Sequence, residues 1–310
     1  MRSQIFEMKK FHWTKPGKYF SNKSLAQKTR RFFHPQTIYP DAAADKTLKS
    51  GVFRVDTHVH TRFSDGSATV QQVENACLSM NIGCCITDHN EIRGSLMLLD
   101  QMKVPTIPSI EIGSKEQIEL LIFFRHPEEA EDFFRQYIEP IRRNYRFSFL
   151  PLSLDYLAEA ASEYDTLICL PHPFAPFWKN IEYGKKRREV IFRTLNHLDC
   201  IEAYNSTATH KANSKSLALC QILGRIPLAG SDSHAITTIG MAGIDFFNRV
   251  TSDNLFDSIK NDQISRIFEN ETKLRHVSNT CRLVLNHSKN IVMNHDPSYL
   301  SKRKFTLHKR

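Results

Sequence analysis

Short apolar runs alternate with amphipathic segments through most of the chain, and this alternation limits the possible folds more than any other feature. The apolar runs are rich in β-branched and aromatic residues and cover residues 52–60, 84–87, 105–112, 118–124, 166–172, 200–205 and 226–232. The amphipathic segments between them cover residues 68–80, 91–102, 127–145, 153–163, 186–198 and 209–223. Strands that alternate with helices predict parallel βα units. Because seven strands favour a barrel over a short open sheet, we expect an α/β fold with a TIM-like (β/α)7 barrel.

Charge is distributed unevenly along the 310 residues, which carry a formal net charge of +9. Residues 1–50 contain eleven Lys and Arg against three Asp and Glu, and residues 271–310 contain nine against two, so the segment between them is acidic. An α/β barrel commonly takes about 250 residues as one domain. We therefore expect a basic N-terminal extension at 1–50, one α/β domain at 51–270, and a basic C-terminal helix and tail at 271–310.

The basic ends allow two interpretations. Basic segments interleaved with aromatic residues, such as Phe11, Trp13 and Tyr19, are typical of contacts with nucleic acid. Lys-rich termini can instead be solubilising tails. Both interpretations stay open, and a nucleic-acid partner is therefore one expectation for these ends.

Several classes of protein are disfavoured. No apolar run approaches the roughly 18 to 20 residues that span a membrane, so we expect no membrane partner. The N-terminus has early charge but no apolar stretch typical of a secretory signal, although its basic composition leaves a mitochondrial presequence open. The seven Cys form no C-x-x-C pair and several lie in apolar runs, which indicates buried thiols in a reducing, cytoplasmic compartment. A metal ion would therefore need His and carboxylate ligands.

Residues of the types that bind metals stand at the ends of the apolar runs. The first run ends with Asp56, His58 and His60, whose two-residue spacing places them on one face of a strand. In parallel α/β folds, functional residues gather at the carboxyl ends of the strands. The same end of the predicted barrel would also carry Asp65, His89, Glu111, His172, Asp232 and His234.

Each of these residues also has a simpler interpretation. A single His-x-His pair could be solvated, His172 between two prolines could belong to a stiff turn, and Glu111 could pair with a surface Lys. As a group they are harder to explain in this way, because burying unpaired charges costs several kcal/mol each. A bound divalent cation offsets that cost, and the pattern therefore predicts a metal centre.

The motifs HVHTRFSDG (58–66), ITDHN (86–90), IEI (110–112), LPHPF (170–174), IEAYN (201–205) and GSDSH (230–234) occur in this order over about 180 residues. This series resembles the PHP (polymerase and histidinol phosphatase) domain family. The resemblance implies a distorted seven-stranded β/α barrel over residues 51–270, with two or three divalent metals at its mouth. It also implies that Glu111 bridges two metals and that the ligands are His58, His60, Asp65, His89, Glu111, His172, Asp232 and His234.

One position departs from the family pattern. Members with three metals usually carry a further His at the end of the strand that follows the Glu, where this chain has Glu119 or Leu120. Either Glu119 replaces that His as an oxygen ligand, or the third metal is weak or absent. His126 is a poor substitute because it lies beyond the strand, directly before a helical segment.

The ligand types also suggest the metals and the chemistry. Mixed imidazole and carboxylate ligation suits Mn²⁺, Zn²⁺ or Fe²⁺ and argues against Ca²⁺. Two such ions would activate a bridging hydroxide for attack on phosphorus. Asp232, His234 and His89 are then candidates to orient that hydroxide or to protonate the leaving group. Asp56 could accept a hydrogen bond from an imidazole, or equally from the backbone.

Substrate contacts are expected from four further residues. Asn205 ends the sixth run, and Arg93 follows the second run closely. Arg187 or Arg188, in the basic stretch GKKRREV, could bind a phosphate at the barrel mouth. A charged stretch that opens a helix is more often a solvated face, so this interpretation has a simple alternative.

Three functions remain in competition. The first is a phosphoesterase that hydrolyses a phosphomonoester, either a nucleotide or a small metabolite. The second is a metal-dependent nuclease or exonuclease that trims nucleic-acid ends, which the basic termini would favour. The third is a PHP-like module that binds ligands without catalysis, and the near-complete ligand set argues against it.

Overall fold

The computed structural model describes residues 51–142, 149–175, 180–182 and 184–269. The strands in this part of the chain are β1 (Val52–Val59), β2 (Gly83–Ile86), β3 (Ser109–Gly113), β4 (Glu119–Phe124), β5 (Thr166–Leu170), β6 (Cys200–Asn205), β7 (Ile226–Gly230), β8 (Ala242–Val250) and β9 (Ile264–Glu269). The helices are α3 (Val70–Met80), α4 (Arg93–Gln101), α5 (Pro127–Phe133), α6 (Glu139–Arg142), α7 (Leu154–Ala161), α8 (Lys185–Thr194), α9 (His210–Leu223) and α10 (Ser252–Lys260). A π-helical turn (Phe134–Ile138) joins α5 to α6, and a short 3-10 turn (Ile236–Thr238) precedes β8. The seven predicted strands and the alternating helices are confirmed, and the fold is α/β.

The strands form two sheets rather than one closed barrel. One sheet has the order β2-β1-β8-β9, and the other has the order β3-β4-β5-β6-β7. Both edges of β1 are occupied, by β2 in parallel and by β8 in antiparallel orientation, so β7 has no free edge of β1 to pair with. Within the described residues the two sheets are linked by the isolated bridges Val59–Ser233 and His89–Glu111. The expected closed barrel is therefore not observed there.

The expectation of all-parallel strands is also wrong for β4. This strand runs antiparallel to both β3 and β5. The reason is the connection between β3 and β4, which is only the turn Ser114–Ile118. Parallel neighbours need a crossover of about a dozen residues or more, whereas a short turn joins antiparallel strands. Strands β8 and β9 and helix α10 were not anticipated by the sequence pattern.

Local sequence signals explain where several helices begin and end. Thr69 caps α3 and forms a capping box with Gln72, in which each side chain accepts a hydrogen bond from the backbone of the other residue. Thr209 caps α9 by accepting a hydrogen bond from the backbone of Ala212. Gly224 ends the same helix with a φ of 60°, a left-handed conformation that glycine adopts at little cost.

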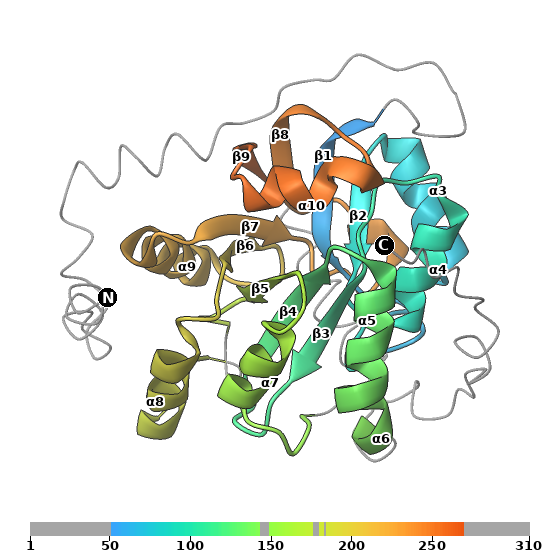
Figure 1. The fold of residues 1–310 in the computed structure, drawn as a ribbon. Helices are drawn as coiled ribbons and strands as arrows, with labels where there is room; N and C mark the ends of the chain where they lie inside the picture. The colour runs from blue at the N-terminus through green and yellow to red at the C-terminus, as the bar shows by residue number, and fades with distance from the viewer. Residues whose placement is uncertain (1–50, 143–148, 176–179, 183, 270–310) are drawn as a thin grey trace, which may run out of the picture.

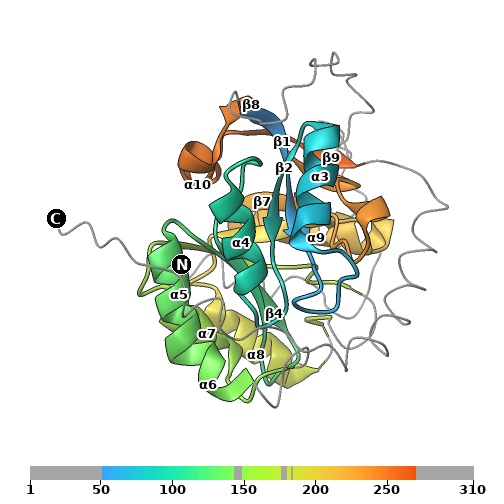
Figure 2. The same ribbon diagram turned by 90° about the vertical axis from the view of Figure 1, so that its right-hand side faces the viewer.

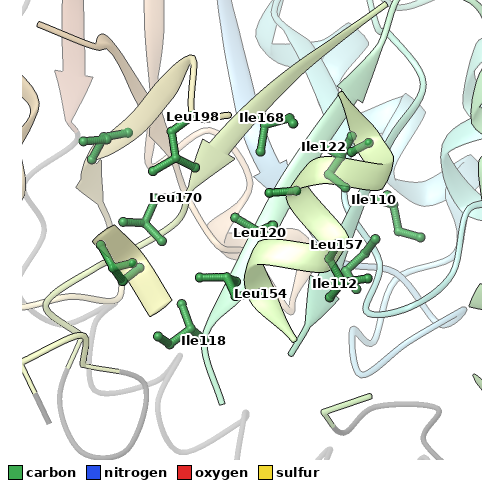
Figure 3. Close-up of a cluster of buried hydrophobic side chains, with 14 of the residues drawn as sticks. Ile110, Ile112, Ile118, Leu120, Ile122, Leu154, Leu157, Ile168, Leu170 and Leu198 are labelled. Carbon is green, nitrogen blue, oxygen red and sulfur yellow. The ribbon is translucent and has the colours of Figure 1, made fainter. Parts of the chain in front are cut away.

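The helices cover the outer faces of both sheets (Figure 1). Helices α3 and α4 lie beside β1 and β2, and the view in Figure 2 looks onto this pair. Helices α5 and α7 pack on β4, and α9 packs on β6. The alternation of side chains along β4 shows why both faces of this sheet are apolar. Leu120 and Ile122 face the helices in the cluster of Figure 3, whereas Leu121 and Phe123 belong to a second cluster that joins the two sheets.

Two other expectations can be compared with the structure. Six of the cysteines lie in the described residues, and all six are buried and free, as predicted (Cys77, Cys84, Cys85, Cys169, Cys200 and Cys220). In the same part of the chain, no helix combines the length and the apolar character that crossing a bilayer requires. The predicted basic extension at 1–50 and the predicted C-terminal helix and tail at 271–310 lie outside the described residues.

Candidate metal centre

The nine predicted metal ligands lie together between the two sheets. They come from the carboxyl ends of β1, β2, β3, β5 and β7 and from the start of β4, and every one of them is buried. The set consists of five His and four carboxylates: His58, His60, His89, His172, His234, Asp65, Glu111, Glu119 and Asp232. Four groups of these residues have ligand atoms that all lie within 4.8 Å of one another. The sequence therefore predicted a real spatial cluster.

Glu111 is at the centre of this cluster. Its Oε1 atom lies 3.3 Å from His172 Nε2. Its Oε2 atom lies 3.4 Å from His58 Nε2 and 3.3 Å from His60 Nε2. The same oxygen lies 3.1 Å from His89 Nδ1. Since its two oxygens face different histidines, the Glu111 carboxylate has the placement that a bridging ligand needs.

Asp232 and Asp65 provide further oxygens to the cluster. Asp232 Oδ1 lies 3.3 Å from His60 Nε2 and 3.6 Å from His58 Nε2. Asp65 Oδ1 lies 3.2 Å from His234 Nε2, and its Oδ2 lies 3.6 Å from His89 Nε2. His60, Asp65, His89 and His234 form one of the four compact groups.

Glu119 reaches the cluster because β4 is antiparallel. It is the first residue of β4 and pairs with Gly113, the last residue of β3, so both lie at the end of the sheet where β3 ends. Glu119 Oε2 lies 3.5 Å from His172 Nε2, and its Oε1 lies 3.8 Å from His89 Nδ1. His126 follows the far end of the same strand and is exposed at the start of α5. The structure thus brings Glu119 into the cluster and leaves His126 outside it.

The donor set fits a divalent cation. The Nε2 atoms of His58 and His60 face each other at 3.0 Å, an arrangement that suits two imidazoles directed at one positive ion. Burial lowers the pKa of His60, but hydrogen bonds to Asp232 and Glu111 outweigh it and raise that pKa to about 10. Burial likewise lowers the pKa of His58, and the negative charges of Glu111, Glu202 and Asp232 outweigh it and raise the pKa well above its usual range. The cluster therefore has an excess of buried negative charge that protons or a dication must balance.

The backbone is adapted to bring these groups together. His172 and Asp232 have φ values of 27° and 51°, a left-handed conformation that is uncommon for residues other than glycine. Such strain is concentrated at functional sites, where the surrounding structure enforces it. Gly230 ends β7 directly beside His58, and a Cβ atom at this position would lie 2.3 Å from the Cβ of His58. Only glycine allows β7 to pass so close to the histidine.

Glu202 contacts the cluster directly, and the sequence reasoning did not single it out. It is fully buried in β6, and its Oε1 lies 3.0 Å from His58 Nδ1. An ionised carboxylate can only accept hydrogen bonds, so Nδ1 of His58 carries the proton and donates a hydrogen bond to Glu202. In the neutral ring, the lone pair is then on Nε2, which points into the cluster. Glu202 Oε2 also accepts hydrogen bonds from the backbone N–H of His172 (2.8 Å) and from Asn205 Nδ2 (3.0 Å). A lone Glu in the otherwise apolar run CIEAYN was the available signal.

Two aspartates hold the loops around the cluster. Asp56 accepts hydrogen bonds from Ser231 N (2.9 Å), Ser231 Oγ (2.5 Å) and Gly240 N (2.8 Å). Of its two expected roles, the backbone contact is therefore the one observed, and Glu202 is the acceptor for an imidazole. Asp88 accepts from Thr61 N and Thr61 Oγ1, each at 2.6 Å, which fixes the loop that leads to Asp65.

The four residues expected to contact substrate have different surroundings in the structure. Asn205 is fully buried, and its amide nitrogen donates to Glu202 and to Asp232 Oδ2 (3.3 Å), so it holds Asp232 in place. The guanidinium of Arg93 is buried against Glu91, with Nε 2.9 Å from Glu91 Oε1. Arg187 Nη2 donates to Gln117 Oε1 (2.7 Å) in the turn that precedes β4. Arg188 lies half-buried on the same helix, α8.

Comparisons with known proteins give one partial family match and several structures that share the fold. The model of the PHP-associated family (PHP_C) matches residues 210–264. No curated protein matches the sequence significantly. A two-domain protein from Bacteroides vulgatus, described as containing a predicted PHP-like metal-dependent phosphoesterase, shares the fold with a TM-score of 0.52 and 13% identity, over 81% of this chain and 75% of that one.

Two further structures share the fold. One is a lesion-specific endonuclease from Pyrococcus furiosus, with a TM-score of 0.52 and 17% identity over 80% of this chain and 74% of that one. The other is an amidohydrolase from Chromobacterium violaceum, with a TM-score of 0.51 and 13% identity over 69% of this chain and 97% of that one. The PHP-associated match at residues 210–264 and the shared fold agree with the resemblance of the ordered motifs to the PHP family.

Proposed function

We propose that the protein is a metal-dependent hydrolase of phosphoric ester bonds, acting on a phosphomonoester such as a nucleotide or a small phosphorylated metabolite. The observation that carries the proposal is the buried convergence of five imidazoles and four carboxylates at the ends of the strands. A set of this kind suits Mn²⁺, Zn²⁺ or Fe²⁺. The number of ions would be two or three.

The nine clustered residues would hold the metals, with Glu111 between two of them. Bound divalent ions would lower the pKa of a water molecule toward neutrality and neutralise charge on the phosphoryl oxygens. The chain's own part is to fix the ligand atoms. Glu202 directs Nε2 of His58 into the cluster, and Asn205 and Thr207 hold Oδ2 of Asp232 at 3.3 and 3.0 Å, which leaves Oδ1 facing the histidines.

Proton transfer is best assigned to the residues of the cluster that are least completely buried. Asp232 and His89 have the largest exposed fractions among the nine side chains, 11% and 9%, so substrate would approach from their side. Nδ1 of His234 lies 2.9 Å from the backbone oxygen of Asp232, to which it donates, so this ring is held with Nε2 toward Asp65. We therefore assign Asp232 and His89 to the orientation of water and to leaving-group protonation, with His234 in support. Arg187 is the candidate for binding the phosphate.

A substrate panel tests the proposal. The purified protein is stripped with chelator, reloaded with Mn²⁺, and offered an aryl phosphate, 3′- and 5′-phosphorylated nucleotides, and end-labelled oligonucleotides. Release of inorganic phosphate from monomeric phosphoesters, absent without metal, supports it. If the metal-loaded protein cleaves none of these compounds, the proposal is wrong and the third possibility, a binding module without catalysis, gains support.

A nuclease is the second candidate. The fold is shared with a lesion-specific endonuclease, and both ends of this chain are basic. Oligonucleotide cleavage without phosphate release from nucleotides would favour it. Deleting residues 1–45 tests the basic extension separately, because loss of a phosphate contact reduces the salt dependence of oligonucleotide binding.

A further inference from the structure

We infer that the metal centre has two unequal parts, and that Glu119 creates an oxygen-rich position at which Zn²⁺ is favoured over Mn²⁺ less strongly than at the nitrogen-rich positions. This inference rests on the proposed function only in requiring that the cluster binds metal. It concerns which ion each part selects.

The donor atoms are distributed unequally over the cluster. His58, His60 and Asp232 form a compact group with two imidazoles and one carboxylate. Around Asp65, the imidazoles of His60, His89 and His234 give a group with three nitrogen donors and one carboxylate. By contrast, the group around Glu119 has two carboxylates, Glu111 and Glu119, and the single imidazole of His89.

Sharing of His89 between two groups increases this difference. Its Nε2 faces Asp65 at 3.6 Å, whereas its Nδ1 faces Glu111 at 3.1 Å and Glu119 at 3.8 Å. A neutral imidazole has one lone pair, so it can ligate through only one of these nitrogens. If Nε2 binds an ion beside Asp65, the position at Glu119 has His172 as its remaining imidazole, 3.5 Å from Glu119 Oε2. Even if His89 and His172 both bind there, the two carboxylates equal the imidazoles in number, whereas imidazoles outnumber carboxylates in the other two groups.

Ligand type decides the preference between ions. Carboxylates suit Mn²⁺ and Mg²⁺, whereas imidazole suits Zn²⁺, Fe²⁺ and similar ions. Zn²⁺ generally binds more tightly than Mn²⁺ at any site of this kind. We therefore expect a smaller ratio of Zn²⁺ affinity to Mn²⁺ affinity at the Glu119 position than at the nitrogen-rich positions. The carboxylate stands at the start of β4, paired with Gly113, and a change of its head group leaves the packing of Leu121 and Phe123 farther along the strand unaltered.

Metal counting on three variants tests the inference. Chelated wild-type protein, Glu119→Gln and Glu119→His are titrated separately with Mn²⁺ and Zn²⁺. Free Mn²⁺ is followed by electron paramagnetic resonance, and bound ions are counted by mass spectrometry after gel filtration. Glu159→Gln, which removes an exposed carboxylate from α7, is the matched control.

We expect Glu119→Gln to weaken or lose one ion while the remaining ions keep their affinity. Glu119→His should raise the Zn²⁺ to Mn²⁺ affinity ratio of that one ion by about tenfold or more, the scale on which single changes around a metal alter its binding. The control should match the wild type. Unchanged ion content and Mn²⁺ affinity in Glu119→Gln, or an unchanged ratio in Glu119→His, would overturn the inference.

These readouts separate this inference from the proposed function. Ion counts do not depend on phosphate release, so a protein that hydrolyses no phosphoester can still show the unequal positions. Conversely, an active phosphoesterase whose Glu119 variants bind metals like the wild type would retain the proposed function and lose this inference. Circular dichroism of each metal-free variant confirms that the fold is intact.

Discussion

The two sheets of the domain contact each other through an apolar region and through a polar one. The apolar contact joins Val55 and Ile244 of the four-stranded sheet to Leu121, Phe123 and Leu167 of the five-stranded sheet. The polar contact is the metal cluster at the carboxyl ends of the strands. Buried apolar surface stabilises the fold without regard to charge. Buried carboxylates and imidazoles do so only when their charges are balanced.

This difference predicts that a bound divalent ion would stabilise the fold, in addition to the catalytic role that we propose for it. Backbone pairing between the sheets is restricted to two isolated bridges in the described residues, Val59–Ser233 and His89–Glu111, and both lie at the cluster. The first sheet contributes mainly histidines, and the second contributes three of the four carboxylates, Glu111, Glu119 and Asp232. An ion bound by both would connect the sheets where their hydrogen bonding is sparse.

The largest effect is expected from removing the central charge of the polar contact. Glu111→Gln keeps the shape of the side chain but removes the carboxylate that faces four histidines. Metal ions contribute several kcal/mol of transition-state stabilisation, so the phosphoesterase rate should fall on the order of 10³-fold, together with loss of bound metal. Phosphate release and ion content measure this. A variant with normal activity would show that the polar contact is not the catalytic centre.

The apolar contact should respond in the opposite way. Phe123 is fully buried on the inner face of β4, and Phe123→Ala should lower the free energy of unfolding by about 3–5 kcal/mol. Because no metal ligand is changed, the added stability from Mn²⁺ should be the same in variant and wild type. Denaturant unfolding with and without Mn²⁺ measures both quantities. Loss of the Mn²⁺ increment in this variant would mean that the two contacts are not independent.

A smaller effect is expected for the residue that orients the ligands. Glu202→Gln weakens the hydrogen bonds to His58 Nδ1 and to the backbone of His172 without removing a ligand. Changes to such supporting groups typically reduce metal affinity by about 10–100-fold. Titration with Mn²⁺ should show this decrease, whereas activity at saturating Mn²⁺ should recover most of the wild-type value. Failure to recover at saturation would assign Glu202 a direct part in the reaction.

The mildest test uses pH on the metal-free protein. Since the pKa of His60 is raised to about 10 in the folded state, its protonation stabilises the fold fully below the unfolded value of about 6.5, and this stabilisation is lost as pH rises toward 10. Unfolding free energies measured between pH 6 and pH 10 should therefore decrease for the wild type and change less for His60→Gln. With Mn²⁺ bound, the decrease should be smaller because the ion replaces the protons. Equal pH profiles for the two proteins would contradict this account of the polar contact.

Sequence patterns predicted which side chains lie together better than they predicted the sheets. The two-residue spacing of His58 and His60 and the position of His172 at a strand end depend only on local periodicity, and these residues lie where the pattern placed them. The direction of β4 follows from the short turn at Ser114–Ile118, which is too short for a parallel crossover, and the alternation of strands and helices elsewhere in the chain obscured this signal. Glu202 was missed because its contact with His58 requires the neighbour order of the strands. Arg93 was assigned to substrate because its buried partner, Glu91, gives no signal of burial in sequence.

Metal content is the most direct test of the central claim that the polar contact is a divalent metal centre. The wild-type protein and the His58→Ala, His60→Ala double variant are loaded with Mn²⁺, passed through gel filtration, and analysed for bound ions by mass spectrometry. We predict at least two ions per chain in the wild type and a clear loss in the variant, with circular dichroism showing that both are folded. Less than one ion per wild-type chain, or equal ion content in the two proteins, would contradict it.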